Sequence, residues 1–153
     1  LRTSLIVGFP GETDEEFEEL LNFVKETRFD RLGAFKYSQE EDTPAYKMKG
    51  QIPESVKKER LKKIMKSQAK IAKGKNKLLL GTVQKVLVEG ISEETEFLLC
   101  GRTMQQSPDN IDGITYINKG TPSPGDIVNV LITNAGEYDL VGEIIEELAV
   151  VCS

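Results

Sequence analysis

The segment Gly8-Phe9-Pro10-Gly11-Glu12 is the part of this chain best suited to bring its backbone close to a ligand. Glycine adopts positive φ and proline fixes its own φ, so the segment predicts a rigid turn after an apolar run. Thr13 and Glu16 then form a T-x-x-E capping box that opens a helix. Backbone N–H groups at such a strand-to-helix turn bind ligands in α/β folds, and we expect a nucleoside-like ligand here. The segment lacks P-loop and G-x-G-x-x-G spacing, and a plain strand-to-helix connection is the alternative.

Two predicted strands, residues 1–7 and 31–37, flank the helix that follows this turn. A strand, a helix to about residue 27 and a second strand form a parallel βαβ unit. If Phe35 packs against the helices, alternation directs polar side chains of both strands to the inner face of a barrel. The side chains predicted on that inner face are Arg2, Ser4, Lys36 and Ser38. The alternative is that Arg2 and Lys36 reach solvent at the strand edges.

Composition excludes several classes of function. The 153 residues contain no histidine, which excludes Ser-His-Asp and Cys-His catalysis and histidine metal sites. The two cysteines, Cys100 and Cys152, lack C-x-x-C spacing, which argues against a disulfide framework or a metal knuckle and fits a reducing cytoplasm. No apolar run has the length of a membrane span, and Leu1 in place of methionine suggests a processed product or a fragment. We therefore predict no catalytic residue and no metal ligand within these residues.

The remaining pattern predicts an α+β fold in two portions. A basic amphipathic helix over residues 53–73, ended by Gly74, completes a partial parallel (βα) barrel segment over residues 1–76. Residues 77–153 then form a five-stranded antiparallel OB-like β-barrel. Its predicted strands are residues 78–89, 95–103, 114–118, 126–134 and 139–148.

The two portions carry opposite charge. Residues 1–76 contain 16 basic and 13 acidic residues, a net of +3, whereas residues 77–153 contain 4 and 12, a net of −8. OB-like barrels bind nucleic acid through basic grooves with exposed aromatics, and the only aromatics here are Phe97, Tyr116 and Tyr138. An acidic barrel attracts a basic protein instead, or serves only solubility. The basic helix, whose predicted outer face includes Lys57 and Arg60, could contact RNA phosphates, but it lacks interleaved aromatics, so a solvated outer face is favoured.

Three stretches of the chain resemble the carboxyl-terminal portion of radical S-adenosylmethionine methylthiotransferases. Residues 1–13 resemble the fifth barrel strand and its turn, and residues 35–45 resemble the sixth strand and the following loop. Gly101-Arg102-Thr103 and the segment 124–128 are similar to a TRAM domain. Residues 2–4, 35–38 and 108–113 resemble the branch that methylthiolates an aspartate of a small-subunit ribosomal protein. The tRNA-modifying branch, whose TRAM domain binds tRNA, and a stand-alone binding module are the alternatives.

The resemblance implies a division of labour within a longer polypeptide. The family uses S-adenosylmethionine and two [4Fe-4S] clusters, whose six cysteines are absent here, so the amino-terminal remainder would hold both clusters. Gly8, Phe9, Pro10, Gly11 and Glu12 would lie on the S-adenosylmethionine side. Arg2, Ser4, Lys36 and Ser38 would line the substrate wall. The implied partner is a basic small-subunit ribosomal protein, with nucleic acid less favoured and no membrane, and this chain alone would be inactive.

Overall fold

A computed structural model describes residues 1–92, 98–107 and 113–145 of the chain. Contacts divide the chain into two compact units, residues 1–72 and 73–153. No helix in the described part of the chain is long and apolar enough to cross a membrane. Three features singled out above lie outside the described residues: Phe97, Cys152 and residues 108–112 of the predicted loop.

The first unit begins with the predicted parallel βαβ unit. Strand β1 (Arg2–Val7) pairs in parallel with β2 (Arg31–Lys36), and helix α1 (Asp14–Thr27) connects them. The capping box is present, because the Thr13 hydroxyl accepts from the Glu16 N–H at 3.2 Å and the Glu16 carboxylate accepts from the Thr13 N–H at 2.9 Å. The prediction of a helix opened by Thr13 is therefore confirmed, including its end at Thr27.

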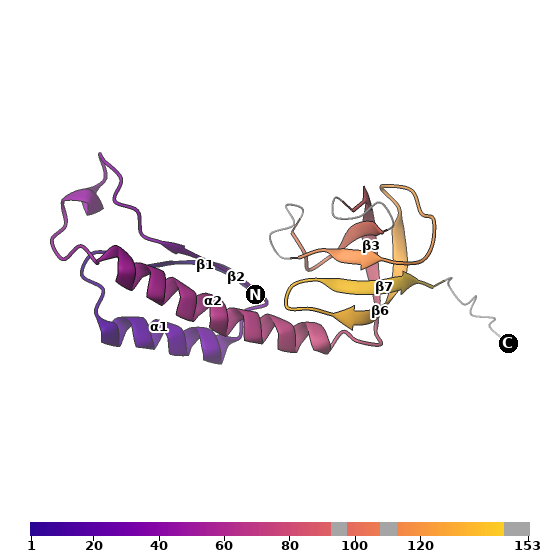
Figure 1. Ribbon diagram of the computed structural model, residues 1–153, viewed down its shortest axis with the longest axis horizontal. Helices are drawn as coiled ribbons and strands as arrows, with labels where there is room; N and C mark the ends of the chain where they lie inside the picture. The colour runs from indigo at the N-terminus through magenta and orange to yellow at the C-terminus, as the bar shows by residue number, and fades with distance from the viewer. Residues whose placement is uncertain (93–97, 108–112, 146–153) are drawn as a thin grey trace. The chain divides into compact units, whose positions relative to one another are not determined.

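Two helices cover the same face of the small sheet, as Figure 1 shows. After a short 3₁₀ helix, η1 (Pro44–Lys47), the chain enters the long helix α2 (Glu54–Lys77). Apolar side chains of α1, α2 and both strands form one core, which removes their surface from water and holds the helices on the sheet. That core consists of Val7, Phe17, Leu21, Val24, Phe29, Leu32, Ile64 and Ile71.

The side of β2 that meets the helices differs from the prediction. Leu32 is 9% exposed and Ala34 packs against the core, whereas Phe35 is 59% exposed. Phe35 therefore does not pack against the helices, and the premise used to orient this strand is wrong. Because side chains alternate along a strand, Lys36 shares the helix-facing side with Leu32.

Helix α2 continues past the residue predicted to end it. Gly74 lies inside α2, which ends at Lys77, so the predicted stop is wrong. Glycine lacks the side chain that favours helix, at a cost of about 1 kcal/mol relative to alanine, but it does not forbid the helical conformation. The buried Asn76 amide in the last turn donates to the backbone oxygens of Gly136 and Glu137 at 3.4 and 3.2 Å. This contact within the second unit ties down the final turn.

The second unit is a closed barrel of five strands. These are β3 (Val83–Ile91), β4 (Leu99–Thr103), β5 (Thr115–Ile117), β6 (Ile127–Ala135) and β7 (Leu140–Ile144). The order around the barrel is β3-β4-β5-β7-β6, and β6 pairs with β3 to close the ring. The predicted start of the first barrel strand at residue 78 is too early, because residues 78–81 form turns.

One strand pair corrects the expectation of a fully antiparallel barrel. Strands β5 and β7 pair in parallel, and the other four pairs of the ring are antiparallel. A closed ring with an odd number of strands cannot alternate in direction at every step, so at least one pair must be parallel. The barrel is therefore mixed.

Small residues let the barrel strands approach one another closely. A Cβ on Gly142 would lie 2.5 Å from the Leu131 backbone oxygen, and one on Gly101 would lie 2.4 Å from that of Leu87. The barrel core itself is filled by branched aliphatic side chains, which suit a pleated, curved surface. They are Val86, Val88, Ile117, Val130, Ile132 and Leu140.

Candidate functional site

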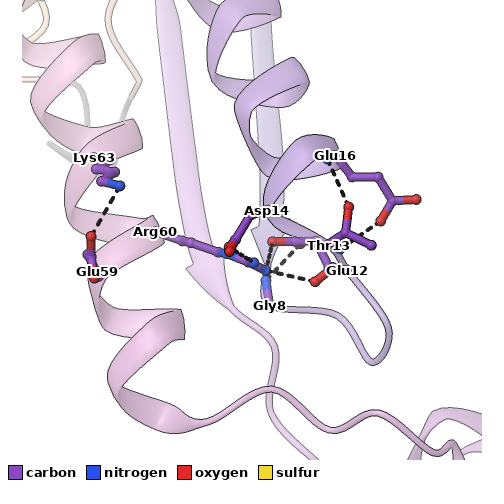
Figure 2. A network of polar contacts seen from close by, with 8 residues as sticks. All are labelled: Gly8, Glu12, Thr13, Asp14, Glu16, Glu59, Arg60 and Lys63. Atoms are coloured by element: carbon purple, nitrogen blue, oxygen red, sulfur yellow. Dashed lines mark hydrogen bonds and ion pairs between the residues drawn. The ribbon is translucent and has the colours of Figure 1, made fainter.

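The turn after β1 is closed by one of its own side chains. Gly8 and Gly11 have φ of 75° and 89°, values that favour glycine. The Gly8 N–H donates to Glu12 Oε2 at 2.8 Å, and the Glu12 N–H donates to the Phe9 oxygen at 3.0 Å. Figure 2 shows the Glu12 side chain directed back at Gly8. The carboxylate therefore fixes the conformation of the predicted ligand-binding turn.

Arg60 of helix α2 clamps this turn from the helix side. Its Nη1 donates to Glu12 Oε1 at 2.6 Å and its Nη2 to Asp14 Oδ1 at 2.7 Å (Figure 2). Arg60 Nη1 also donates to the Glu12 backbone oxygen at 3.1 Å, and its guanidinium carbon lies 5.3 Å from the centre of the Phe17 ring. Burial alone would lower the pKa of Arg60, but the hydrogen bond to Asp14 and the charge of Glu12 outweigh it, so its pKa is raised. Arg60 therefore remains cationic while it holds the turn.

Lys57, one turn earlier in α2, joins the turn to the end of β2. Its aliphatic stem lies against Gly8, where an added Cβ would be 2.4 Å from Lys57 Cγ. Its ammonium donates to the Tyr37 backbone oxygen at 3.1 Å and lies 5.0 Å from the Tyr37 ring centre. The Tyr37 ring also meets the Phe9 ring edge to face, with centroids 5.3 Å apart. One buried lysine thus fixes the carboxyl ends of both parallel strands relative to each other.

The connection after β2 also lies against the turn. The Gly11 N–H donates to the Gly50 backbone oxygen at 2.9 Å. Gly50 has φ of 79°, and a Cβ there would lie 3.3 Å from the Gly11 nitrogen. One side of the turn is therefore covered by this contact, and the N–H groups of Gly8, Gly11 and Glu12 all have partners within the protein.

The five residues predicted on the cofactor side lie together in this turn, but they differ in what they expose. Gly8 and Pro10 are buried, whereas Phe9 and Gly11 are exposed. Both carboxylate oxygens of Glu12 already have partners, so its part is to position the turn. Their binding role stays a prediction.

The four residues predicted for the inner wall do not share one face of the sheet, and Ser38 lies beyond the end of β2. Arg2 and Ser4 share with Ile6 the exposed face of β1, away from the helices. Lys36 lies on the helix-facing side and pairs with Glu54 at the start of α2, and the Ser38 hydroxyl donates to Glu40 Oε1 at 2.6 Å. The structure therefore does not bring the four side chains onto one wall. Leu32 and Ala34 pack against the helices, and alternation along β2 then directs Lys36 to that same side. Whether any of them binds substrate stays a prediction.

The pairing of Lys36 with Glu54 predicts a measurable titration. The hydrogen bond from Lys36 lowers the pKa of Glu54, helped by the charge of Lys36 and opposed by desolvation. A carboxyl group with a lowered folded pKa contributes stability above its ordinary pKa, and this is lost as pH falls through the lowered value. We expect Lys36→Met to raise the pKa of Glu54, as measured by NMR titration of its carboxyl carbon. Lys58→Met, which removes only a more distant charge, should raise it less, and an equal rise in both variants would contradict the pairing.

Sequence reasoning missed the two cations that hold the turn. It assigned Lys57 and Arg60 to the solvated face of the basic helix, but they are 7% and 5% exposed. The signal was present in the spacing: residues 57, 60, 64, 68 and 71 recur every three or four positions, on the face of the apolar stripe. Long side chains can bury their stems and still satisfy their charged ends, so a basic residue within the stripe is compatible with the core.

Comparisons with known proteins find a named domain within the second unit and close relatives of the whole chain. Residues 80–145 match the model of the TRAM domain. The ribosomal protein uS12 methylthiotransferase RimO of Syntrophotalea carbinolica is 56% identical over 147 residues, which cover 96% of this chain and 32% of that protein. The proteins of the same name from Geotalea uraniireducens and Geobacter sulfurreducens are 57% and 58% identical over 145 residues. The chain spans about a third of the length of these curated relatives.

Proposed function

Because the chain belongs to the RimO family of ribosomal protein uS12 methylthiotransferases, we propose that it forms the carboxyl-terminal region of such an enzyme. The observation that carries the proposal is the 56% identity to a relative over 96% of the chain. In this proposal residues 1–76 complete part of the S-adenosylmethionine side of a barrel, and residues 77–153 dock the target protein. The enzyme acts in the cytoplasm.

The turn of residues 8–12 would form part of the wall beside S-adenosylmethionine. The turn follows a parallel strand. Its exposed residues are Phe9, which offers the edge of an aromatic ring, and Gly11, which has no Cβ. A ligand with a flat base and a polar chain can stack on such an edge and approach the glycine closely. When bound, S-adenosylmethionine supplies the radical chemistry of the family. The part of this chain is to hold the wall rigid through Glu12 and Arg60.

The iron–sulfur clusters do not fit this chain. No group of three or more metal-ligating side chains occurs among the described residues, and the whole sequence has two cysteines where a [4Fe-4S] cluster takes three or four. We therefore assign both clusters to the part of the polypeptide that the relatives have in addition. On its own this chain would bind target protein without converting it.

The second unit would recognise the basic target by charge. Residues 77–153, which include the whole barrel, carry a net charge of −8 against −5 for the entire chain, and opposite charges steer encounter and fix orientation. Among its described acids, Asp126 and Asp139 accept from backbone N–H groups of Ser123 and Ile114 at 2.8 and 2.9 Å. Exposed Glu137 has no such bond in the described residues and remains available to a cationic partner.

The test uses the full-length protein with both clusters reconstituted, and two substrates, ribosomal protein uS12 and a tRNA anticodon stem-loop. We expect mass spectrometry to show one methylthio group gained by an aspartate of uS12 and none by the RNA. The KM for uS12 should rise as salt screens the acidic barrel, whereas the affinity for S-adenosylmethionine should change little. Modification of the stem-loop alone, or a KM for uS12 that is independent of salt, would overturn the proposal.

A further inference from the structure

Helices α1 and α2 enclose a surface groove whose charged side chains are all lysines. The groove has a volume of about 400 Å³ and is lined by Leu21, Lys25, Lys63, Lys66, Ser67 and Lys70. We call these six residues the lysine groove. No carboxylate lines it, although the chain as a whole has a net charge of −5. The groove lies within the first unit, where α1 and α2 run side by side in Figure 1.

Most of the positive charge in the lysine groove is not neutralised by the protein. Lys63 pairs with Glu59 at 3.1 Å, and Lys25 donates to the side chain of Asn22 at 3.3 Å, which is uncharged. Lys66 and Lys70 have no carboxylate within ion-pair distance in the described residues. Such uncompensated like charges repel one another, so an anion that binds among them relieves an unfavourable term as well as adding a favourable one.

The spacing of these charges suits a chain of anions better than a single small one. Lys63, Lys66 and Lys70 lie three and four residues apart, on one helix face, with a rise of about 1.5 Å per residue. The charges are therefore spread along roughly 10 Å of helix and do not converge on one point. Lys25 supplies a further charge from the opposite wall, and the Ser67 hydroxyl can donate a hydrogen bond between them. Regularly spaced phosphates of a polymer can meet several of these groups at once.

We propose that the lysine groove binds the phosphodiester backbone of an RNA strand. A membrane surface is a poorer match, because interfacial helices place exposed apolar side chains beside their lysines. The one apolar residue of the groove, Leu21, is 8% exposed and belongs to the core. This goes beyond the function proposed above, which assigns the target protein to the second unit. A target bound there would be modified while RNA is held by the first unit.

The test measures the affinity of the full-length protein for a fluorescein-labelled oligouridylate, by anisotropy over a series of salt concentrations. Lys66→Gln combined with Lys70→Gln keeps the aliphatic stems and removes two charges. Each contact with a single strand contributes about 0.7 to the slope of log affinity against log salt, so the double variant should lower that slope by about 1.4. Its affinity near 0.1 M salt should fall about tenfold.

The matched control is Lys47→Gln combined with Lys49→Gln, which removes two exposed lysines that precede α2 and lie outside the groove. It should retain affinity within about twofold, since long-range attraction is screened over roughly 10 Å. Equal weakening in both double variants would overturn the proposal, as would the absence of RNA binding by the unmodified protein. Tight binding to phosphatidylserine vesicles that needs Lys66 and Lys70 would overturn it in favour of a membrane. Methylthiolation of isolated uS12 should be unchanged in the groove variant, so this test does not depend on the proposed docking.

Discussion

Arg60→Met is expected to destabilise the protein by about 3 kcal/mol, because it leaves the Glu12 carboxylate, only 13% exposed, without its cationic partner. Arg60 is 5% exposed, and it donates to both Glu12 and Asp14. Methionine retains most of the stem, so the loss reports the missing charge and its hydrogen bonds more than a cavity. The measurement is urea unfolding of the full-length protein, followed by a probe in this unit. The same variant should bind S-adenosylmethionine more weakly by calorimetry, because Glu12 would no longer be held against Gly8.

The matched control is the neighbouring ion pair of α2. Lys63→Met breaks the exposed pair with Glu59, which Figure 2 shows beside the clamp, and should cost no more than about 0.5 kcal/mol. Glu12→Gln added to Arg60→Met should recover part of the lost stability, because the remaining group is then uncharged. A cost for Arg60→Met no larger than that for Lys63→Met would contradict the clamp.

Gly8→Ala is expected to cost about 3 kcal/mol, the sum of backbone strain and overpacking. The φ of 75° at Gly8 disfavours any side chain, and the new Cβ would lie 2.4 Å from Lys57 Cγ. The lysine stem cannot withdraw freely, because its ammonium is held by the Tyr37 oxygen. We expect the turn to shift, and both thermal stability and the affinity for S-adenosylmethionine to fall.

Gly11→Ala separates the two causes of this effect. Gly11 has φ of 89°, but a Cβ there would meet nothing within 4 Å. It should therefore carry only the strain of the left-handed region, about 1 kcal/mol. Lys57→Ala should reduce the cost of Gly8→Ala when the two are combined, since it removes the atom that clashes. Equal costs at Gly8 and Gly11 would show that packing against Lys57 is unimportant.

Local patterns predicted the beginning of the first unit well. The T-x-x-E box at Thr13 and the acidic first turn specify where α1 begins, because they satisfy N–H groups that the helix leaves unpaired. The short strand, helix and strand then predict a parallel βαβ connection, which the pairing of β1 with β2 confirms. The alternation that suggested a small barrel from residue 77 onward also led to the correct class.

The same patterns did not predict which side of β2 meets the helices or which charged side chains pair with one another. Phe35 and Leu32 are both apolar, so alternation alone could not say which of them meets the helices. Leu32 does, so the strand residues predicted for one wall, Arg2, Ser4 and Lys36, lie on two faces. The sequence also counted Arg60 as a surface charge, because its acceptors, Glu12 and Asp14, lie more than forty positions earlier in the chain.

The sequence by itself determined the elements that depend on near neighbours: the capped helix, the glycine turn, the βαβ unit and the apolar stripe of α2. These elements follow from backbone preferences and from residue spacings of three or four positions, which are visible in the sequence itself. Only the tertiary structure decided which side of β2 meets the helices, which lysines are buried, and that one barrel pair is parallel. Those outcomes depend on how distant segments of the chain pack together and on how the barrel closes. No short stretch of sequence contains both partners of such a contact.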